Sequence, residues 1–185
     1  MPLRTSTETR LLDAADELFF RDGVAATPID AVIARAGVST ATLYRGFASK
    51  EALLAAALER RHRAWLQTWD EAIAVHDTPE GRLLAVFDAL DAFRAGPLAS
   101  RWCAFLGSAA EHADPPAELA EALRRETDDL RGRLVDLAGA VDPRRGDQLG
   151  EQLVLVVTGD IAMRLRSPDW TTDVARAVAT TLIRG

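Results

Sequence analysis

Apolar residues recur every three or four positions along most of the chain. The first such stripe consists of Leu11, Ala15, Leu18 and Phe19. This spacing is typical of an amphipathic α-helix that buries one face. Strand-like alternation is missing, and Pro and Gly fall at intervals suited to helix ends. The pattern predicts an all-α fold of about nine helices.

Residues that begin and end helices divide the chain into segments. Thr5, Thr27, Ser39 and Ser49 are placed to act as N-caps, whose side chains accept a hydrogen bond from the first helical turn, and Glu8 completes a capping box with Thr5. Gly23 and Gly37 are placed to end helices. With the Pro-containing breaks further on, we expect helices at about 5–22, 28–36, 40–47, 50–76, 81–95, 98–112, 116–140, 143–166 and 169–184.

The two short helices on either side of Gly37 are the most informative pair. A helix-turn-helix needs a small residue at its turn and apolar residues that lock the two helices together. Gly37 supplies the turn, and the lock consists of Ile33, Val38, Leu43 and Phe47. The second helix of such a pair presents its outer face to the major groove of DNA. Residues 28–47 are therefore predicted to form a helix-turn-helix.

The second short helix begins with small residues. Thr40, Ala41 and Thr42 stand at its N-terminus, where short side chains allow the backbone to approach base edges closely. A threonine hydroxyl can hydrogen-bond to a base, and the methyl groups of threonine and alanine can contact the methyl group of thymine. These three residues are the predicted base contacts.

Longer polar side chains flank the predicted base contacts. Tyr44, Arg45 and Lys50 have the reach of phosphate contacts, which position a protein on DNA without specifying sequence. Thr27 and Ser39 are predicted to act first as helix caps and second as phosphate ligands. Lys50 is the only lysine of the chain.

The N-terminal third resembles the TetR family of bacterial transcriptional regulators over about residues 6–58. The resemblance rests on A-x-x-L-F-x-x-x-G at 15–23, A-G-V-S at 36–39, T-L-Y at 42–44, Phe47 and Ser49-Lys50-Glu51. It implies that the residues at six positions touch DNA: Thr27, Thr40, Ala41, Thr42, Tyr44 and Lys50. One departure is Gly46, where the family usually has histidine, tyrosine or another bulky residue.

Other interpretations of this region stay open at the level of sequence. A short helix pair turned at glycine also occurs in proteins that never bind DNA, and there Tyr44 and Phe47 would belong to the core. Periodicity alone favours that view, whereas the full residue string favours DNA binding. A second hypothesis is a helical protein-interaction adaptor that has lost sequence-specific DNA recognition, supported by Gly46 and by the acidic C-terminal part.

Charge is distributed unevenly along the chain. The formal net charge is -6, but residues 1–61 carry eight Lys/Arg and eight Asp/Glu, whereas residues 62–185 carry fourteen and twenty. A neutral segment can still bind DNA if its positive side chains gather on one face. We therefore predict a three-helix DNA-binding domain at 4–64, and a larger helical effector-binding and dimerisation domain at 65–185.

Large apolar residues of the C-terminal part are candidates for the effector pocket that the family resemblance implies. Trp65 and Trp69 are one turn apart, a spacing that more often indicates plain core. Such pockets are mainly apolar, so we expect a small, largely apolar effector. The candidate lining residues are Trp65, Trp69, Phe87, Leu90, Phe93, Trp102, Cys103, Phe105, Leu106 and Met163.

The last two predicted helices are apolar over much of their circumference and need more than one neighbour to cover them. Burial within a single chain is the alternative to a dimer interface. In the family, the pair joins its symmetry mate in a four-helix bundle, and a twofold dimer sets two recognition helices about 34–36 Å apart on a palindromic operator. The candidate interface residues are Leu149, Leu153, Val156, Val157, Ile161, Trp170, Val174 and Val178.

These expectations combine into a ligand-responsive, homodimeric transcriptional repressor. The three histidines lie far apart, and no Ser-His-Asp, H-E-x-x-H or Gly-rich phosphate signature is found, so no enzymatic activity, cofactor or metal is expected. No apolar run approaches the ~20 residues that span a bilayer, and the N-terminus lacks the apolar core of a signal peptide. The single cysteine suits a reducing compartment, so a cytoplasmic location is expected.

Overall fold

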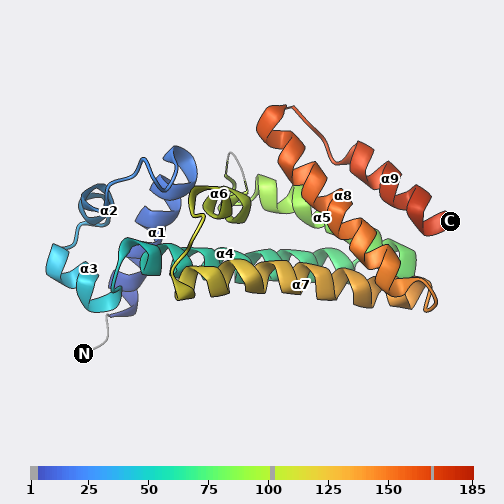
Figure 1. The fold of residues 1–185 in the computed structure, drawn as a ribbon, viewed down its shortest axis with the longest axis horizontal. Helices are drawn as coiled ribbons and strands as arrows, with labels where there is room; N and C mark the ends of the chain where they lie inside the picture. Colours follow the sequence, from blue (N-terminus) through green and yellow to red (C-terminus); the bar gives the residue numbers. More distant parts are fainter. Residues whose placement is uncertain (1–3, 101–102, 168) are drawn as a thin grey trace. The chain divides into compact units, whose positions relative to one another are not determined.

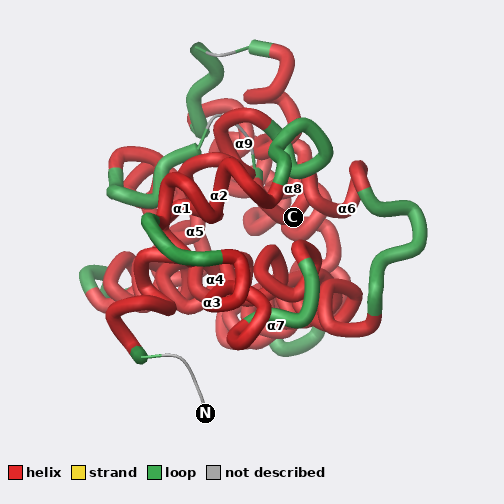
Figure 2. The backbone as a smooth tube through the Cα atoms, turned by 90° about the vertical axis from the view of Figure 1, so that its left-hand side faces the viewer, coloured by secondary structure: helices red, strands yellow, loops and turns green. Residues whose placement is uncertain are grey.

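The computed structural model describes residues 4–100, 103–167 and 169–185. Within these residues every regular element is an α-helix, as Figure 2 shows. The nine helices found there are α1 (Thr5–Asp22), α2 (Ile29–Ala36), α3 (Thr40–Gly46), α4 (Lys50–Ala74), α5 (Pro79–Ala95), α6 (Ala104–Glu111), α7 (Ala117–Val141), α8 (Gly146–Arg166) and α9 (Asp173–Arg184) (Figure 1). The predicted all-α class with about nine helices is confirmed.

The chain divides into two compact units. The first comprises Met1–His62 and Cys103–Arg124, and the second comprises Arg63–Trp102 and Arg125–Gly185. Helices α4 and α7 each contribute residues to both units. The predicted functional boundary at 64/65 concerns which residues bind DNA, and it stays a prediction. The order of segments along the sequence did not indicate that residues 103–124 would pack in one unit with the N-terminal helices.

The core of the first unit is built mainly from helix faces that the apolar spacing predicts. Leu11 and Phe19 of α1 are completely buried, and α2 buries Val32. Ala104 of α6 and Leu119 of α7 belong to the same cluster. The first unit is therefore a helix-turn-helix region whose core is completed by residues from beyond position 100.

The second unit has a separate apolar core, to which Trp69 of α4 and Phe87 of α5 contribute fully buried rings. Within it, α7 and α8 approach each other closely at two glycines. A Cβ added at Gly150 would stand 2.6 Å from the Cα of Val135, and one added at Gly146 would stand 2.7 Å from the Cα of Gly139. Close packing of these helices thus requires the absence of a side chain at both positions.

A buried carboxylate ties the segment between α8 and α9 to α5. The side chain of Asp160 has no solvent exposure, and it accepts hydrogen bonds from Arg94 at 2.6 Å and from the indole Nε1 of Trp170 at 2.9 Å. Thr172 donates to Asp91 at 2.7 Å beside this pair. Because buried charges need partners, this network fixes the path of the chain into α9.

Two of the four predicted N-caps are confirmed, and two are wrong. Thr5 is the first residue of α1 and not its cap, because the helix starts one residue earlier than the capping box predicts, after Arg4 in an extended conformation. Ser39 accepts a hydrogen bond from the N–H of Thr42 at 3.2 Å, and Ser49 accepts one from the N–H of Ala52 at 3.1 Å. Thr27 caps nothing, because α2 begins at Ile29 after an extended Pro28. The Thr27 hydroxyl instead donates to the carbonyl of Gly23 at 2.7 Å, at the end of α1.

Candidate nucleic-acid interface

The turn between α2 and α3 is formed by Gly37 in the left-handed backbone region, with φ +63° and ψ 42°. Glycine adopts this conformation without the steric cost that a side chain brings. The N–H of Gly37 donates to the carbonyl of Ala34 at 3.2 Å, and the N–H of Val38 donates to that of Ile33 at 3.3 Å. These bonds satisfy the end of α2 and turn the chain directly into α3.

The predicted lock between the two helices is confirmed. Leu43 of α3 is completely buried, and Phe47 and Ile33 are each 9% exposed. Val38 packs against the same cluster. Since one face of α3 is held in the core, its opposite face has a fixed orientation and is available for contact.

The exposed face of α3 carries the predicted base contacts and phosphate contacts. Thr40, Ala41 and Arg45 are exposed, and Tyr44 keeps 50% of its surface accessible. Thr42 is half-buried, and its hydroxyl lies 2.8 Å from that of Ser39, the exposed N-cap. These residues come together on one short helix and its N-cap, as the sequence predicts.

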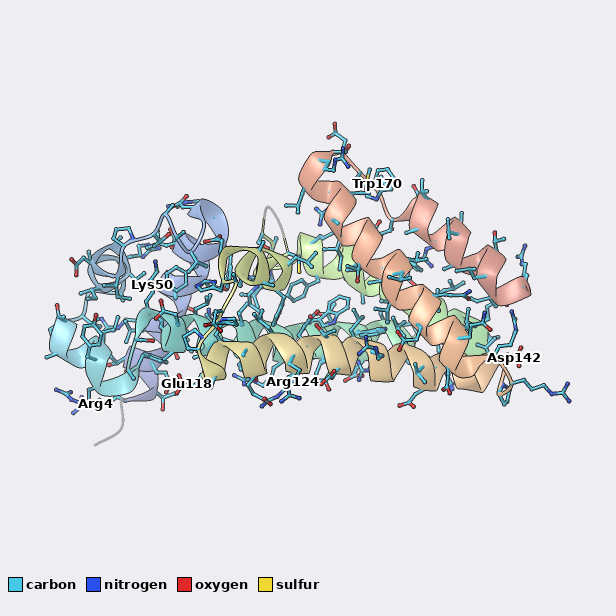
Figure 3. All side chains as sticks on the ribbon, in the orientation of Figure 1. Arg4, Lys50, Glu118, Arg124, Asp142 and Trp170 are labelled. Atoms are coloured by element: carbon cyan, nitrogen blue, oxygen red, sulfur yellow. The ribbon has the colours of Figure 1, made fainter. Side chains whose placement is uncertain are left out.

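Lys50 begins α4 beside the turn between α1 and α2 (Figure 3). Its ammonium group donates to the carbonyl of Val24 at 2.5 Å and lies 5.8 Å from the centre of the Phe19 ring. An ammonium group has three donors. The bond to Val24 therefore leaves two N–H groups of Lys50 for a phosphate.

Thr27 differs from the other candidates because its side chain is only 3% exposed. Its hydroxyl is engaged with the carbonyl of Gly23 and lies 3.2 Å from that of Leu18. The first N–H groups of a helix have no partner within the helix. A phosphate at this end of α2 would therefore meet backbone N–H groups, not the Thr27 hydroxyl.

Arg10 of α1 is a cation that sequence analysis did not single out. Its Nη1 atom lies 3.8 Å from the position that a Cβ on Gly37 would occupy, so the guanidinium group stands beside the helix-turn-helix. Neither Arg10 nor Arg45 has an ion-pair partner among the described residues, whereas Arg35 is paired with Glu17 at 2.6 Å. Because positions 10 and 37 are far apart in the sequence, no local sequence pattern predicts this proximity.

The predicted pocket residues fall into both units. Trp69, Phe87 and Leu90 lie in the core of the second unit, with the ring centre of Trp65 5.5 Å from that of Trp69. Met163 is a half-buried residue of α8 in the same unit. Cys103, Phe105 and Leu106 are half-buried residues of the first unit, and Trp102 lies outside the described residues.

One group in the second-unit core has an unmet hydrogen-bonding need. Trp69 is completely buried, and its indole Nε1 has no hydrogen-bond partner among the described residues. The Arg133 guanidinium lies over the ring, 5.0 Å from its centre, but it has no acceptor atom for the Nε1 proton. A buried indole N–H usually finds a partner, so this donor marks a place where an acceptor would be stabilised.

Two clefts open on the second unit. A cleft of about 490 Å³ is lined by residues of α4 and α7: Leu66, Ile73, Asp128, Asp129, Gly132, Arg133, Asp136 and Leu137. A smaller one of about 200 Å³ is lined by Ala64, Gln67, Thr68, Glu71, Ala92, Phe93, Gly96, Pro97 and Leu98. Of the candidate pocket residues, Phe93 lines the smaller cleft, and none lines the larger one.

The predicted interface residues separate into buried and exposed groups. Leu149, Leu153 and Val157 are at most 1% exposed and already pack in the core of their own unit, so they are not surface residues of α8. Val156 and Ile161 pack partly against the same core, and Trp170 is half-buried with its indole bonded to Asp160. Val174 and Val178 of α9 are exposed by 56% and 45%. Leu155 of α8, which sequence analysis did not name as an interface residue, is 74% exposed.

In the part of the chain that the structure describes, no group of three His, Cys, Asp or Glu side chains is arranged to hold a metal ion. No helix in that part is long and apolar enough to cross a membrane.

Comparisons with known proteins agree with this geometry. Residues 11–57 match the family model described as bacterial regulatory proteins of the tetR family. No curated protein sequence matches the chain. Among solved structures, the TetR-family transcriptional regulator SCO4454 from Streptomyces coelicolor has a TM-score of 0.88 and 26% identity, with 97% of this chain and 89% of that chain covered.

Two further solved structures extend the comparison. The Streptomyces avermitilis protein sav143, described as a TetR-type transcriptional regulator, is 30% identical over 96% of both chains, with a TM-score of 0.81. Escherichia coli NemR in its reduced form shares the fold, with a TM-score of 0.81 at 19% identity and 95% of both chains covered. The chain therefore belongs to the TetR family of bacterial transcriptional regulators.

Proposed function

We propose that this protein is a transcriptional repressor that binds a palindromic operator as a homodimer and is released by a small, largely apolar effector. The observation that carries the proposal is the exposed N-terminal turn of α3 on a helix-turn-helix locked into the core at Leu43 and Phe47. A rigidly held helix with an open face of short polar side chains suits base-edge recognition in the major groove.

Contacts to DNA divide into two classes. Thr40, Ala41 and Thr42 meet base edges, and Tyr44, Arg45 and Lys50 bind phosphates, with Ser39 at the helix cap. Near Thr27, the phosphate contact comes from the backbone at the start of α2, because the Thr27 hydroxyl is internally bonded. Arg10 joins the phosphate contacts on account of its place beside Gly37.

The effector site is proposed within the aromatic cluster of the second unit. Trp65, Trp69, Phe87 and Leu90 provide apolar surface, and the indole N–H of Trp69 provides a buried donor without a partner among the described residues. A ligand with an apolar body and one acceptor satisfies both features. Its binding shifts the protein toward the released state only by as much as its affinities for the two states differ.

The proposed dimer uses exposed apolar residues of α8 and α9. Leu155, Val174 and Val178 are between 45% and 74% exposed, which is unusual for side chains of this kind. A second copy of the chain covers them and places two recognition helices on one duplex. Operator DNA, a second copy and the effector are the partners, in the cytoplasm.

Selection of bound sequences from random duplexes tests the DNA-binding proposal with the full chain. Repeated enrichment of one inverted-repeat sequence, bound more weakly as salt rises, is expected. Tyr44→Phe and Arg45→Ala then weaken binding to the selected duplex about tenfold each. Arg131→Ala removes the same charge from an exposed site on α7 and serves as the control. Absence of any enriched sequence from a folded dimer would favour the adaptor hypothesis.

A further inference from the structure

The backbone of one residue, Val24, is held from two sides by charged side chains of two helices. Lys50 of α4 donates to the Val24 carbonyl at 2.5 Å. Glu111 of α6 accepts from the N–H of Val24 at 3.3 Å and from the N–H of Ala25 at 2.5 Å. Hydrogen bonds with a charged partner are stronger than neutral ones, so both polar groups of Val24 are firmly held.

The held segment is the turn that leads into the helix-turn-helix. α1 ends at Asp22 and is followed by Gly23 with φ +96°, and α2 begins at Ile29. Val24 is 3% exposed, and the Thr27 hydroxyl bonds back to Gly23. Because the backbone of this turn is held, the position of the first residue of α2 is fixed. The packing of α2 against α3 then fixes the position of α3, the proposed recognition helix.

Glu111 stands on an element that is itself anchored. It is the last residue of α6, whose Ala104 and Ser108 are buried in the first unit. Along the chain, α6 directly follows Arg63–Trp102 of the second unit. The hydrogen bonds of Glu111 therefore couple the position of α6 to the turn that precedes α2.

We propose that Glu111 is a positioning residue for DNA recognition: its carboxylate fixes the Val24–Ala25 turn to α6, opposite the Lys50 bond from α4, and so holds α2 and α3 in their DNA-binding orientation. This inference rests on the proposed function. Glu111 is not a DNA contact, since a carboxylate repels phosphate. By charge alone, its removal raises affinity for DNA; by loss of positioning, its removal lowers that affinity. The two roles therefore predict opposite signs.

Amide hydrogen exchange on the full chain without DNA tests the contact itself. In Glu111→Ala, the amides of Val24 and Ala25 exchange at least about tenfold faster than in the wild type, because both lose a charge-assisted acceptor. In Glu111→Gln, which keeps one acceptor oxygen, the increase is smaller. Amides within α1 keep their wild-type rates and show that the unit stays folded. Unchanged rates at Val24 and Ala25 would overturn the proposal.

Affinity for the selected duplex tests the consequence. Glu111→Ala weakens this binding about tenfold with an unchanged dependence on salt, because no phosphate contact is lost. Glu111→Gln recovers part of the affinity. Glu118→Ala removes the same charge from the exposed first turn of α7 (Figure 3) and is the matched control, with affinity equal to or above that of the wild type.

The two proposals fail in different ways. If the wild type enriches no duplex, the proposed function fails, and the exchange rates still report on the contact. If the wild type binds a selected duplex and Glu111→Ala binds it equally well or more tightly, the positioning role is overturned while the proposed function stands. Should Glu111→Ala fail to fold, Glu111→Gln carries both measurements.

Discussion

Glu126 is a carboxylate on a helix face otherwise occupied by leucines. It stands between Leu123 and Leu130, which pack against apolar cores, at the helical spacing of that stripe. Burial raises the pKa of the Glu126 carboxyl to about 7, and the nearby Asp129 adds to the shift. A charge on this face is disfavoured, so the folded chain holds a proton at Glu126 that the unfolded chain releases at lower pH.

Glu126→Gln is expected to stabilise the protein at high pH and to have little effect at low pH. Because the folded pKa lies above the unfolded value, the stability from protonated Glu126 is complete below about pH 4.5 and is lost as pH rises to about 7. The gain at pH 8 is about 2 kcal/mol, allowing for partial solvent access of this half-buried side chain. Urea unfolding at pH 5 and pH 8 measures it, with Glu118→Gln as control. An equal gain at both pH values would contradict the assignment.

Gly46 is the residue at which the chain departs from the family pattern. It is the last residue of α3, and it does not have a positive φ. The backbone therefore does not require glycine here, in contrast to Gly37. The departure removes a side chain from the end of α3 at a position where the backbone would accept one.

At the scale of elements, the packing of α7 on α8 depends on Gly150. Its substitution by alanine is expected to cost roughly 1–3 kcal/mol, because the new Cβ meets the Val135 backbone and the helices must separate. Gly132→Ala, with no atom within 4 Å of its new Cβ, is the control and gains up to about 1 kcal/mol from helix propensity. Thermal unfolding compares the two variants. Equal stability would show that α7 and α8 adjust without strain.

Local chemistry made most elements predictable. Ser39 and Ser49 cap helices as expected because their partners lie three residues ahead, and Gly37 ends α2 through its own backbone. Thr27 does not cap α2, because its hydroxyl group is bonded to the carbonyl of Gly23, four residues earlier. Residue preferences alone do not indicate which of these two interactions a threonine makes. Helix α6 belongs to the first unit because of packing between residues far apart in the sequence, and the spacing of apolar residues does not predict such packing.

The candidate site shows the same division between local and distant information. The residues of α3 were predictable because they are contiguous and face outward on one short helix. Arg10 and Glu111 were not, because each acts on a segment far away in sequence. Buried Leu149 and Leu153 were misplaced in the interface because apolar periodicity marks the inner face of α8 as strongly as an outer one. Sequence therefore predicted the exposed residues of α3 better than the distant residues that pack beside them.

At the scale of the whole molecule, the proposed recognition of a palindromic operator depends on two copies of the chain. One chain supplies one recognition helix, and the affinity of a single half-site is low compared with that of two linked half-sites. The exposed apolar residues of α8 and α9 therefore bear on operator binding even though they are not proposed to touch DNA.

Leu155→Glu is expected to dissociate the dimer and, through it, to weaken operator binding. Placing a charge at a covered apolar site raises the dimer dissociation constant about tenfold to hundredfold, while the stability of the single chain changes little because Leu155 is 74% exposed. Sedimentation velocity measures assembly, and a mobility-shift titration on the selected duplex measures the loss of binding.

Val75→Glu is the matched control for this variant. Val75 is 76% exposed just after the end of α4, so the substitution adds the same charge to the same unit at a residue that belongs to neither α8 nor α9. It leaves both assembly and operator affinity unchanged. If Leu155→Glu behaves like Val75→Glu, the α8–α9 face is not the interface. If Leu155→Glu forms monomers that still bind the full operator with wild-type affinity, then recognition by this protein does not depend on a preformed pair of recognition helices.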